Sequence, residues 1–199
     1  MTDVWNLIRK IAEENGGTFT TKQIEEAGIS RVHLKPFVDN SSVLKISRGY
    51  YALNDTIIDD YALLQKRSHV LLFSHGTALY FWDMSDRIPH IIDVTVPSGT
   101  NVSRIKKDRT DIRFHYVKPD LFDLGIAKTE TSMGNPIRLY DKERCICDLI
   151  RDRKHTDMQI YSQAIKEYFN HQPNMRKLLK YGRLFGIEEK IRTYSEVLA

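Results

Sequence analysis

Near the N-terminus, apolar residues recur at the spacing of a helix and are interrupted by turn residues. The apolar positions run from Val4 to Ala12 and stop at an Asn-Gly-Gly sequence, which predicts a first helix over residues 3–14. A second, short helix is expected over residues 22–27, because Thr20 or Thr21 can cap its first turn with a hydroxyl and a glycine follows its end. The chain therefore begins with two helices separated by a tight turn.

A third helix is expected to begin after Ser30, with an apolar stripe from Val32 to Val38. It follows the second helix after about three residues that include a glycine, which is typical of a helix-turn-helix. Pro36 lies inside this stripe, where it removes an amide donor and crowds the carbonyl four residues earlier, at a cost of up to about 3 kcal/mol. We therefore expect the third helix to kink at Pro36; the alternative is that its regular part begins nearer Lys35.

Two β-prone runs follow the third helix. Residues 43–46 and 50–53 are rich in β-branched, aromatic and other apolar side chains, and the three residues between them include a glycine, which predicts a β-hairpin. A hairpin directly after a helix-turn-helix makes the module a winged one. We therefore assign residues 1–54 to a winged helix-turn-helix DNA-binding domain.

The charges of this domain follow its predicted elements. Residues 1–30 hold three Lys or Arg against five Asp or Glu, whereas residues 31–50 hold four against one. Such a division is typical of a module of which one part faces a polyanion. The third helix and the hairpin are therefore the parts expected to reach DNA.

The residues expected to contact DNA lie at the start of the second helix, on the third helix, on the hairpin, and on one face of a helix near the C-terminus. The first three groups are expected at base edges or phosphates, and the last at the phosphate backbone. For the last group the alternative is a solvated helix face. The residues are Thr20, Thr21, Lys22, Ser30, Arg31, His33, Lys35, Lys45, Ser47 and Arg48, followed by Arg176, Lys177, Lys180 and Arg183.

Residues 55–199 are assigned to a second, larger α+β domain with an all-helical end, which follows a polar linker near residues 54–60. The run from Ile91 to Val96 alternates β-branched residues with Asp93 and Thr95, which predicts a strand. Further strands are expected over residues 113–117 and 137–140, and helices over residues 60–65, 75–82, 142–153, 158–170, 175–184 and 187–198.

No residues of the second domain have the spacing of a catalytic or metal site. We expect the adjacent side chains of Ser74 and His75 to diverge at a helix start, so Ser74 is interpreted as a helix cap and His75 as a packing or hydrogen-bonding residue. There is no G-x-S-x-G or P-loop motif, and the seven histidines are scattered without an H-x-x-x-H pair. Cys145 and Cys147 are interpreted as reduced thiols on or near a helix. We therefore predict no enzymatic activity, no cofactor and no metal.

Composition fits a globular protein and permits a nucleic-acid partner. Of the 199 residues, 41% are hydrophobic, and the formal net charge is +4. A mildly basic charge permits binding to nucleic acid without requiring it. No apolar run approaches the length of a membrane span, and no apolar segment follows the N-terminus. We therefore expect a soluble, cytoplasmic protein.

Several blocks of the sequence resemble a known family. They are SRGYYAL at the end of the hairpin, SHGTALYFWDMSDRIP with the following IDVTVPSGTN, and IRLYDKERCICDLIRDR, in this order. Through these blocks nearly the whole chain resembles the AbiEi-type antitoxins of abortive-infection, type IV toxin–antitoxin systems. The resemblance implies a winged helix-turn-helix that represses its own operon by binding inverted repeats. It also implies a separate C-terminal domain that counters a nucleotidyltransferase-like toxin without a stable complex.

The leading hypothesis is an antitoxin of phage defence that is also a DNA-binding autorepressor, with two copies of the chain on one operator. The alternative is a small hydrolase or nucleotidyltransferase fused to a DNA-binding module, which requires a nucleophile–base or phosphate-binding motif that the sequence lacks. A third hypothesis, an adaptor that contacts only proteins, does not account for basic residues on the elements that would face a DNA groove.

Overall fold

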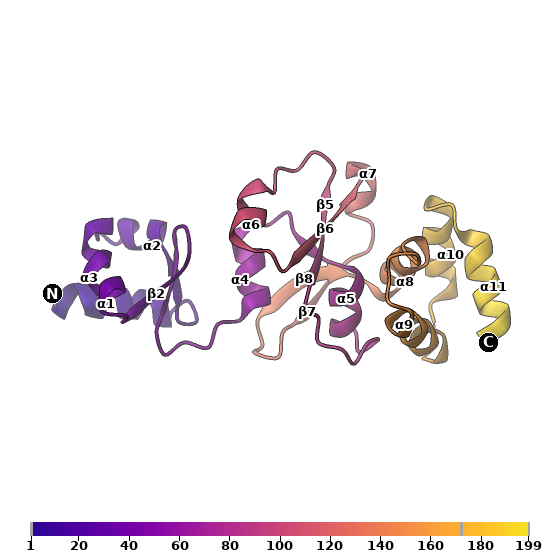
Figure 1. Ribbon diagram of the computed structural model, residues 1–199, viewed down its shortest axis with the longest axis horizontal. Helices are drawn as coiled ribbons and strands as arrows, with labels where there is room; N and C mark the ends of the chain where they lie inside the picture. The colour runs from indigo at the N-terminus through magenta and orange to yellow at the C-terminus, as the bar shows by residue number, and fades with distance from the viewer. Residues whose placement is uncertain (1, 172, 199) are drawn as a thin grey trace. The chain divides into compact units, whose positions relative to one another are not determined.

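The computed structural model describes residues 2–171 and 173–198, and the chain divides into two compact units between Asp60 and Tyr61 (Figure 1). The boundary predicted from the sequence lies slightly earlier, after residue 54. Each unit combines helices with a β-sheet, which confirms the predicted α+β class. Within the two described ranges, no helix is both long and apolar enough to cross a membrane.

The described part of the N-terminal unit combines helices with a three-stranded antiparallel sheet of order β1-β3-β2. Its elements are α1 (Thr2–Glu13), β1 (Thr18–Thr20), α2 (Thr21–Glu26), the 3-10 helix η1 (Arg31–Leu34), α3 (Lys35–Asp39), β2 (Val43–Ser47) and β3 (Tyr50–Leu53). The sequence pattern does not predict β1, which forms by pairing Phe19 with Tyr51 of β3. Apolar side chains from the helices and the sheet, including Ile8, Ile24 and Leu34, form one buried core.

Residues 31–39 form two consecutive helices instead of one kinked helix. Arg31–Leu34 is η1 and Lys35–Asp39 is α3, so Pro36 lies in the first turn of α3. The first amide groups of a helix have no partner within the helix, so proline costs little there and its fixed φ suits the turn. The expected kink at Pro36 is therefore wrong, and the alternative start near Lys35 is confirmed.

The C-terminal unit contains a five-stranded mixed sheet of order β6-β5-β4-β8-β7, followed along the chain by a group of helices (Figure 1). Neighbours β5–β6 and β4–β8 are parallel, and β4–β5 and β7–β8 are antiparallel. The strands are β4 (Leu72–Phe73), β5 (Ile92–Pro97), β6 (Ile112–Val117), β7 (Ile126–Glu130) and β8 (Pro136–Tyr140). The helices are α4 (Asp60–Arg67), α5 (His75–Phe81), α6 (Ser103–Asp108), α7 (Pro119–Phe122), α8 (Lys142–Arg151), α9 (Met158–Asn170), α10 (Met175–Leu184) and α11 (Glu188–Leu198). Helices α9 and α10 have the predicted bounds, whereas β4, β7, α6 and α7 are not predicted by the sequence pattern.

Strand β5 lies between β4 and β6 and is buried on both faces. Side chains along a strand point alternately to opposite faces, and every residue from Ile92 to Val96 is buried. The polar members are hydrogen-bonded: Thr95 Oγ1 donates to Ser74 Oγ at 2.8 Å, and Asp93 Oδ1 lies 2.7 Å from His115 Nε2. The alternation in the sequence therefore marks buried polar contacts and not a solvent-facing side.

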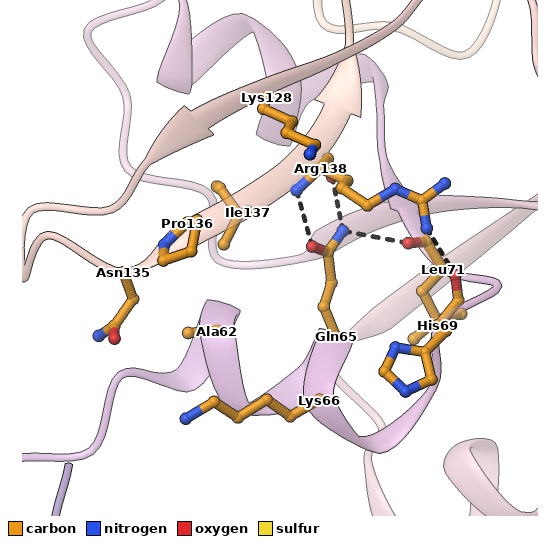
Figure 2. A pocket seen from close by; sticks show the side chains of 10 residues that line it. All are labelled: Ala62, Gln65, Lys66, His69, Leu71, Lys128, Asn135, Pro136, Ile137 and Arg138. Carbon is orange, nitrogen blue, oxygen red and sulfur yellow. Dashed lines mark hydrogen bonds between the residues drawn. The ribbon is translucent and has the colours of Figure 1, made fainter. Parts of the chain in front are cut away.

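Helix α4 is attached to strand β8 by one glutamine side chain. Strand β4 pairs with β8 where Phe73 meets Leu139. At Arg138, the residue of β8 just before Leu139, the side chain of Gln65 makes the hydrogen bonds that a neighbouring strand would make. Its Nε2 donates to the Arg138 carbonyl oxygen, and its Oε1 accepts from the Arg138 N–H at 2.7 Å (Figure 2). The same Nε2 donates to the Leu71 carbonyl oxygen at 3.0 Å. Gln65 therefore joins α4, the start of β4 and β8.

Helix α8 carries a buried arginine in its first turn. Arg144 is 1% exposed, and its Nε donates to Asp148 Oδ2, one turn later, at 2.9 Å. Its Nη1 donates to the carbonyl oxygens of Leu121 and Leu124 at 2.8 and 3.0 Å. A guanidinium buried this deeply needs such partners, because removing an ion from water costs several kcal/mol.

Two aromatic rings lie beside the guanidinium of Arg144. Its central carbon is 4.2 Å from the ring centre of Tyr140 at the end of β8, and 4.5 Å from that of Phe185, which follows α10. Cations at such distances are attracted by the electron-rich faces of aromatic rings. Arg144 therefore connects β8, α7, α8 and the end of α10.

The two cysteines, Cys145 and Cys147, are buried free thiols on α8. Burial raises the pKa of both thiols, so both are protonated at neutral pH. The interpretation of these residues as reduced thiols on a helix is confirmed.

We expect Arg144→Met to lower the free energy of unfolding of the C-terminal unit by about 3 kcal/mol, because the buried Asp148 carboxylate would keep only the more exposed Arg151, 3.2 Å away. The matched control is Arg192→Met. Arg192 also bonds a carboxylate one turn away, Glu188 at 2.6 Å, but at the surface, where such pairs contribute about 0–1 kcal/mol. Urea unfolding followed by circular dichroism measures both variants, and equal losses would contradict the stabilising role of Arg144.

Candidate nucleic-acid interface

The two threonines at the start of α2 differ in what their side chains do. Thr20 caps α2: its Oγ1 accepts from the Gln23 N–H at 3.2 Å, and Gln23 Oε1 accepts from the Thr20 N–H at 2.7 Å. Thr21 is buried, with 8% of its surface exposed. Lys22 is exposed, and its ammonium lies 3.6 Å from the Glu26 carboxylate. Of the three predicted residues, Lys22 has an exposed side chain, whereas Thr20 caps the helix and Thr21 is buried.

The predicted residues of η1 and α3 lie on an exposed surface. Leu34 of η1 is buried in the core, whereas Arg31, His33 and Lys35 are exposed. Arg31 Nε lies 2.7 Å from Glu25 Oε1 of α2, and 71% of the Arg31 side chain remains exposed. This segment therefore presents basic side chains to solvent while Leu34 anchors it to the unit.

An exposed apolar side chain lies among these basic residues. Val32, between Arg31 and His33, is 77% exposed. Ser30, the N-cap residue of η1, is also exposed, and its Oγ lies 3.4 Å from His33 Nδ1. The surface of η1 therefore offers a guanidinium, a hydroxyl and an apolar group, which are among the groups that proteins use to read base edges in the major groove.

The turn of the β2–β3 hairpin is fixed to the start of α2. The Thr21 N–H donates to the Gly49 carbonyl oxygen at 2.9 Å. Gly49 has a φ of 79°, a left-handed conformation that glycine adopts without steric cost. Arg48, in the same turn, is exposed. Arg48 and Lys22 therefore each lie one residue from the same backbone hydrogen bond.

The two other predicted hairpin residues differ in exposure. Lys45 on β2 is exposed. The Ser47 Oγ is buried and, among the residues that the structure describes, has no hydrogen-bond partner. The register between β2 and β3 shifts between these two residues. The irregular pairing thus leaves the Lys45 side chain in solvent and turns the Ser47 hydroxyl inward.

The four basic residues predicted on one face of α10 are not equivalent. Lys177 Nζ lies 3.0 Å from Asp141 Oδ2 and 3.1 Å from Glu143 Oε2, at the start of α8. Burial lowers the pKa of Lys177, but the hydrogen bonds to these carboxylates raise it by more, so that the pKa lies above its usual value. Lys177 therefore joins α10 to α8.

The other three residues of this face remain exposed, and one of them is paired. Arg183 Nε lies 2.9 Å from Glu188 Oε2 in a surface ion pair, and Arg176 and Lys180 are exposed. The basic face of α10 is therefore smaller than the sequence pattern predicts. The spacing of lysines and arginines along the sequence does not show which of them are already paired with a carboxylate.

A pocket in the C-terminal unit is lined by basic side chains. It lies between α4 and the β7–β8 pair and has a volume of about 330 Å³ (Figure 2). Its lining residues are Lys66, His69, Lys128 and Arg138, with Ala62, Gln65, Leu71, Asn135, Pro136 and Ile137. Arg138 Nη1 donates to the His69 carbonyl oxygen at 2.9 Å, which holds the guanidinium beside the pocket. No local motif indicates this pocket, because Gln65 and Arg138 are 73 positions apart.

Ser74 and His75 contact each other, contrary to the expectation that they diverge. Ser74 Oγ lies 3.0 Å from His75 Nδ1, and His75 has a φ of 45°, which non-glycine residues rarely adopt. Ser74 occupies the N-cap position of α5, but its side chain makes no cap hydrogen bond. Burial lowers the pKa of His75 to about 4, so the ring is neutral at pH 7. The Ser74 side chain is fully buried, so its hydroxyl is not open to a substrate.

Two histidines that are far apart in the sequence lie together. The rings of His75 and His115 stack with their centres 3.5 Å apart. One ligand atom from each of them and from Asp152 lies within 4.8 Å of the others. The parallel register of β5 and β6 pairs Thr95 with His115, and Thr95 also bonds Ser74, next to His75. The interpretation of the histidines as scattered is therefore wrong for this pair. The spacing of residues along the sequence does not show which strands will pair and so does not show which histidines will meet.

Comparison with known proteins finds similarity in sequence for the N-terminal unit and in fold for most of the chain. Residues 6–54 match the model of a family described as transcriptional regulators, AbiEi antitoxins, which confirms the resemblance in this unit. The crystal structure of the RV2827C protein from Mycobacterium tuberculosis superposes with a TM-score of 0.68 at 11% identity, covering 92% of this chain and 72% of that one. At this identity the likeness concerns the fold alone. No curated protein sequence matches the chain.

We expect Thr20→Val to lower the free energy of unfolding of the N-terminal unit by about 0.5–2 kcal/mol, because α2 loses its cap while the side-chain shape is kept. Lys22→Ala is the control at the same helix start, and we expect its effect to stay within about 0.5 kcal/mol because the side chain is exposed. Thermal and urea unfolding measure both variants. A loss in Lys22→Ala as large as that in Thr20→Val would contradict this division between scaffold and surface.

Proposed function

We propose that the N-terminal unit is a winged helix-turn-helix that binds double-stranded DNA and regulates transcription. In this proposal α2, η1 and α3 form the helix-turn-helix, and the β2–β3 hairpin is the wing. The observation that carries the proposal is the concentration of exposed basic side chains on these elements, namely Lys22, Arg31, His33, Lys35 and Arg48. The match of residues 6–54 to a family of transcriptional regulators supports it.

Helix η1 is the element proposed to enter the major groove, because the early residues of a recognition helix approach base edges. An arginine such as Arg31 can bond guanine through two donors, and an apolar side chain such as Val32 can contact the methyl group of thymine. Arg31 would exchange its ion pair with Glu25 for the DNA contact. With 71% of its side chain exposed, that pair contributes little and is readily exchanged.

Lys22 and Arg48, which lie close to one backbone hydrogen bond, are proposed to contact neighbouring phosphates beside the groove-facing helix. A module with this few basic groups makes few phosphate contacts, so specific binding needs paired half-sites. We therefore propose that two copies of the chain bind inverted repeats in their own promoter and repress it. Arg176 and Lys180 of α10 add contacts to the phosphate backbone in this proposal.

The C-terminal unit is proposed to act as an antitoxin in a type IV system of abortive infection, in the cytoplasm and in defence against phage. It would counter a nucleotidyltransferase-like toxin without forming a stable complex with it. The match of residues 6–54 to a family of AbiEi antitoxins supports this role. We propose that the unit acts without catalysis, because the Ser74 hydroxyl that a hydrolase would use is buried and accepts a hydrogen bond from Thr95.

We expect Arg48→Ala to weaken binding to the DNA upstream of the gene and to flatten the salt dependence of the binding constant by about one unit of slope or less, since one phosphate contact is lost. Arg9→Ala is the matched control: Arg9 is an exposed arginine of the same unit, on α1, paired with Glu13 at 2.8 Å. Gel shifts at several salt concentrations measure both variants. Unchanged affinity in a correctly folded Arg48→Ala protein would remove the hairpin from the interface.

The two proposed activities are expected to separate in the full-length protein. A triple variant in which Arg31, Lys35 and Arg48 are all replaced by Ala should no longer repress a promoter reporter. It should still protect against the toxin, because all three side chains belong to the N-terminal unit. Growth of cells that co-express the toxin measures protection. Loss of protection by a triple variant that accumulates normally would show that antitoxin activity depends on DNA binding.

A further inference from the structure

We propose that His75, His115 and Asp152 form a binding site for one divalent transition-metal ion, with Zn²⁺ as the reference ion, in the C-terminal unit. One ligand atom from each lies within 4.8 Å of the others. In a tetrahedral zinc site with bonds of about 2.0–2.2 Å, neighbouring ligand atoms lie roughly 3.4 Å apart. Binding therefore requires a small inward movement and a tilt of one ring out of the stack, because the ion must lie in the plane of each imidazole. The three side chains would leave the fourth position of a tetrahedral ion to water. Imidazole nitrogens and a carboxylate oxygen are ligands that Zn²⁺ and its neighbours in the series accept.

Both imidazoles already have one ring nitrogen held by a buried oxygen. His115 Nε2 lies 2.7 Å from Asp93 Oδ1, which leaves Nδ1 for an ion. His75 Nδ1 lies 3.0 Å from Ser74 Oγ, which also accepts a hydrogen from Thr95 at 2.8 Å. With the proton on Nδ1, His75 donates to Ser74 and Nε2 keeps its lone pair for an ion. Metal-binding histidines are commonly held in this way, with the second nitrogen bonded to a carboxylate or another acceptor.

The third ligand and the support of His115 are held by the backbone around them. Asp152 is the C-cap residue of α8, and its Oδ1 lies 2.6 Å from His155 Nδ1, which leaves Oδ2 for an ion. Gly76 allows the approach of Asp93, because a Cβ at position 76 would lie 3.1 Å from Asp93 Oδ2. Each of the three proposed ligands therefore has a hydrogen-bonding partner beside it.

An ion can reach this cluster from solvent. A hollow of about 830 Å³ is lined by all three proposed ligands, and a second one of about 380 Å³ is lined by them as well. The carboxylates of Asp93 and Asp152 add negative charge beside the two rings, which favours a dication. Arg113 Nη1 lies 3.7 Å from Asp93 Oδ1 and offsets part of that charge from the surface side.

A bound ion would join three segments that are distant in the sequence: the start of α5, strand β6 and the end of α8. It would also hold His75 in its left-handed backbone conformation, with a φ of 45°. An ion that binds the folded protein and not the unfolded chain stabilises the fold in proportion to the logarithm of its concentration. The proposed consequence is a C-terminal unit whose melting temperature depends on the metal.

The test uses the full-length protein, freed of metal with a chelator and titrated with Co²⁺ as a visible probe. We expect one equivalent of Co²⁺ to give the absorption bands of a site with nitrogen and oxygen ligands, Zn²⁺ to displace it, and Zn²⁺ to raise the melting temperature. Binding should become about 10- to 100-fold weaker in Asp93→Asn, which alters the group that holds His115, and at least as much weaker in His115→Ala and Asp152→Ala. His171→Ala is the matched control, because His171 lies 3.3 Å from a carboxylate, Glu167, at the surface.

Several outcomes would overturn the proposal. One is the absence of a Co²⁺ spectrum in the wild-type protein, which does not depend on the folding of any variant. Another is an intense near-ultraviolet band from sulfur to cobalt, which would place the ion on Cys145 or Cys147. The third is binding of wild-type strength in folded His115→Ala and Asp152→Ala proteins, or an equal loss in His171→Ala.

Discussion

Burial of one positive charge constrains the architecture of the C-terminal unit. Arg144 is 1% exposed, so its donors need acceptors inside the protein. These acceptors are the Asp148 carboxylate and the carbonyl oxygens of Leu121 and Leu124, and Tyr140 lies beside the guanidinium. Apolar contacts alone would permit α8 to slide against the sheet, since they have little directional preference. The hydrogen bonds of Arg144 do have direction, and they fix α8 at one position.

The position of α8 determines where the side chains at its two ends lie. At its start, Asp141 and Glu143 bind Lys177 of α10 and thereby orient the C-terminal helices. At its end, Asp152 lies beside the stacked rings of His75 and His115. Helix α8 therefore holds the C-terminal helices in place at one end. At its other end it places the Asp152 carboxylate in the polar cluster beside β5 and β6.

Local patterns predicted the elements that depend on nearby residues, including α9, α10 and the β2–β3 hairpin. Strands β1 and β4 could not be predicted from local patterns. Such short strands show no periodicity of apolar residues, and they form only by pairing with strands that are distant in the sequence. Pro36 fits a kinked helix or the first turn of a new one, and the structure selects the second. The exposed basic positions of η1 could be read from sequence. The pairing of Lys177 with two carboxylates and the meeting of His75 with His115 could not, since both arise from tertiary contacts.

The side chain of Gln65 also protects backbone groups that the short strand β4 leaves uncovered. Strand β4 pairs with β8 at a single residue, Leu139. Without Gln65, the neighbouring peptide groups of β8 would be open to a strand from another molecule, which is how sheet edges begin to aggregate. By bonding both the N–H and the carbonyl of Arg138, Gln65 occupies that position with a side chain that cannot propagate a sheet. The unit can therefore keep a two-residue strand inside its sheet without offering a template for intermolecular pairing.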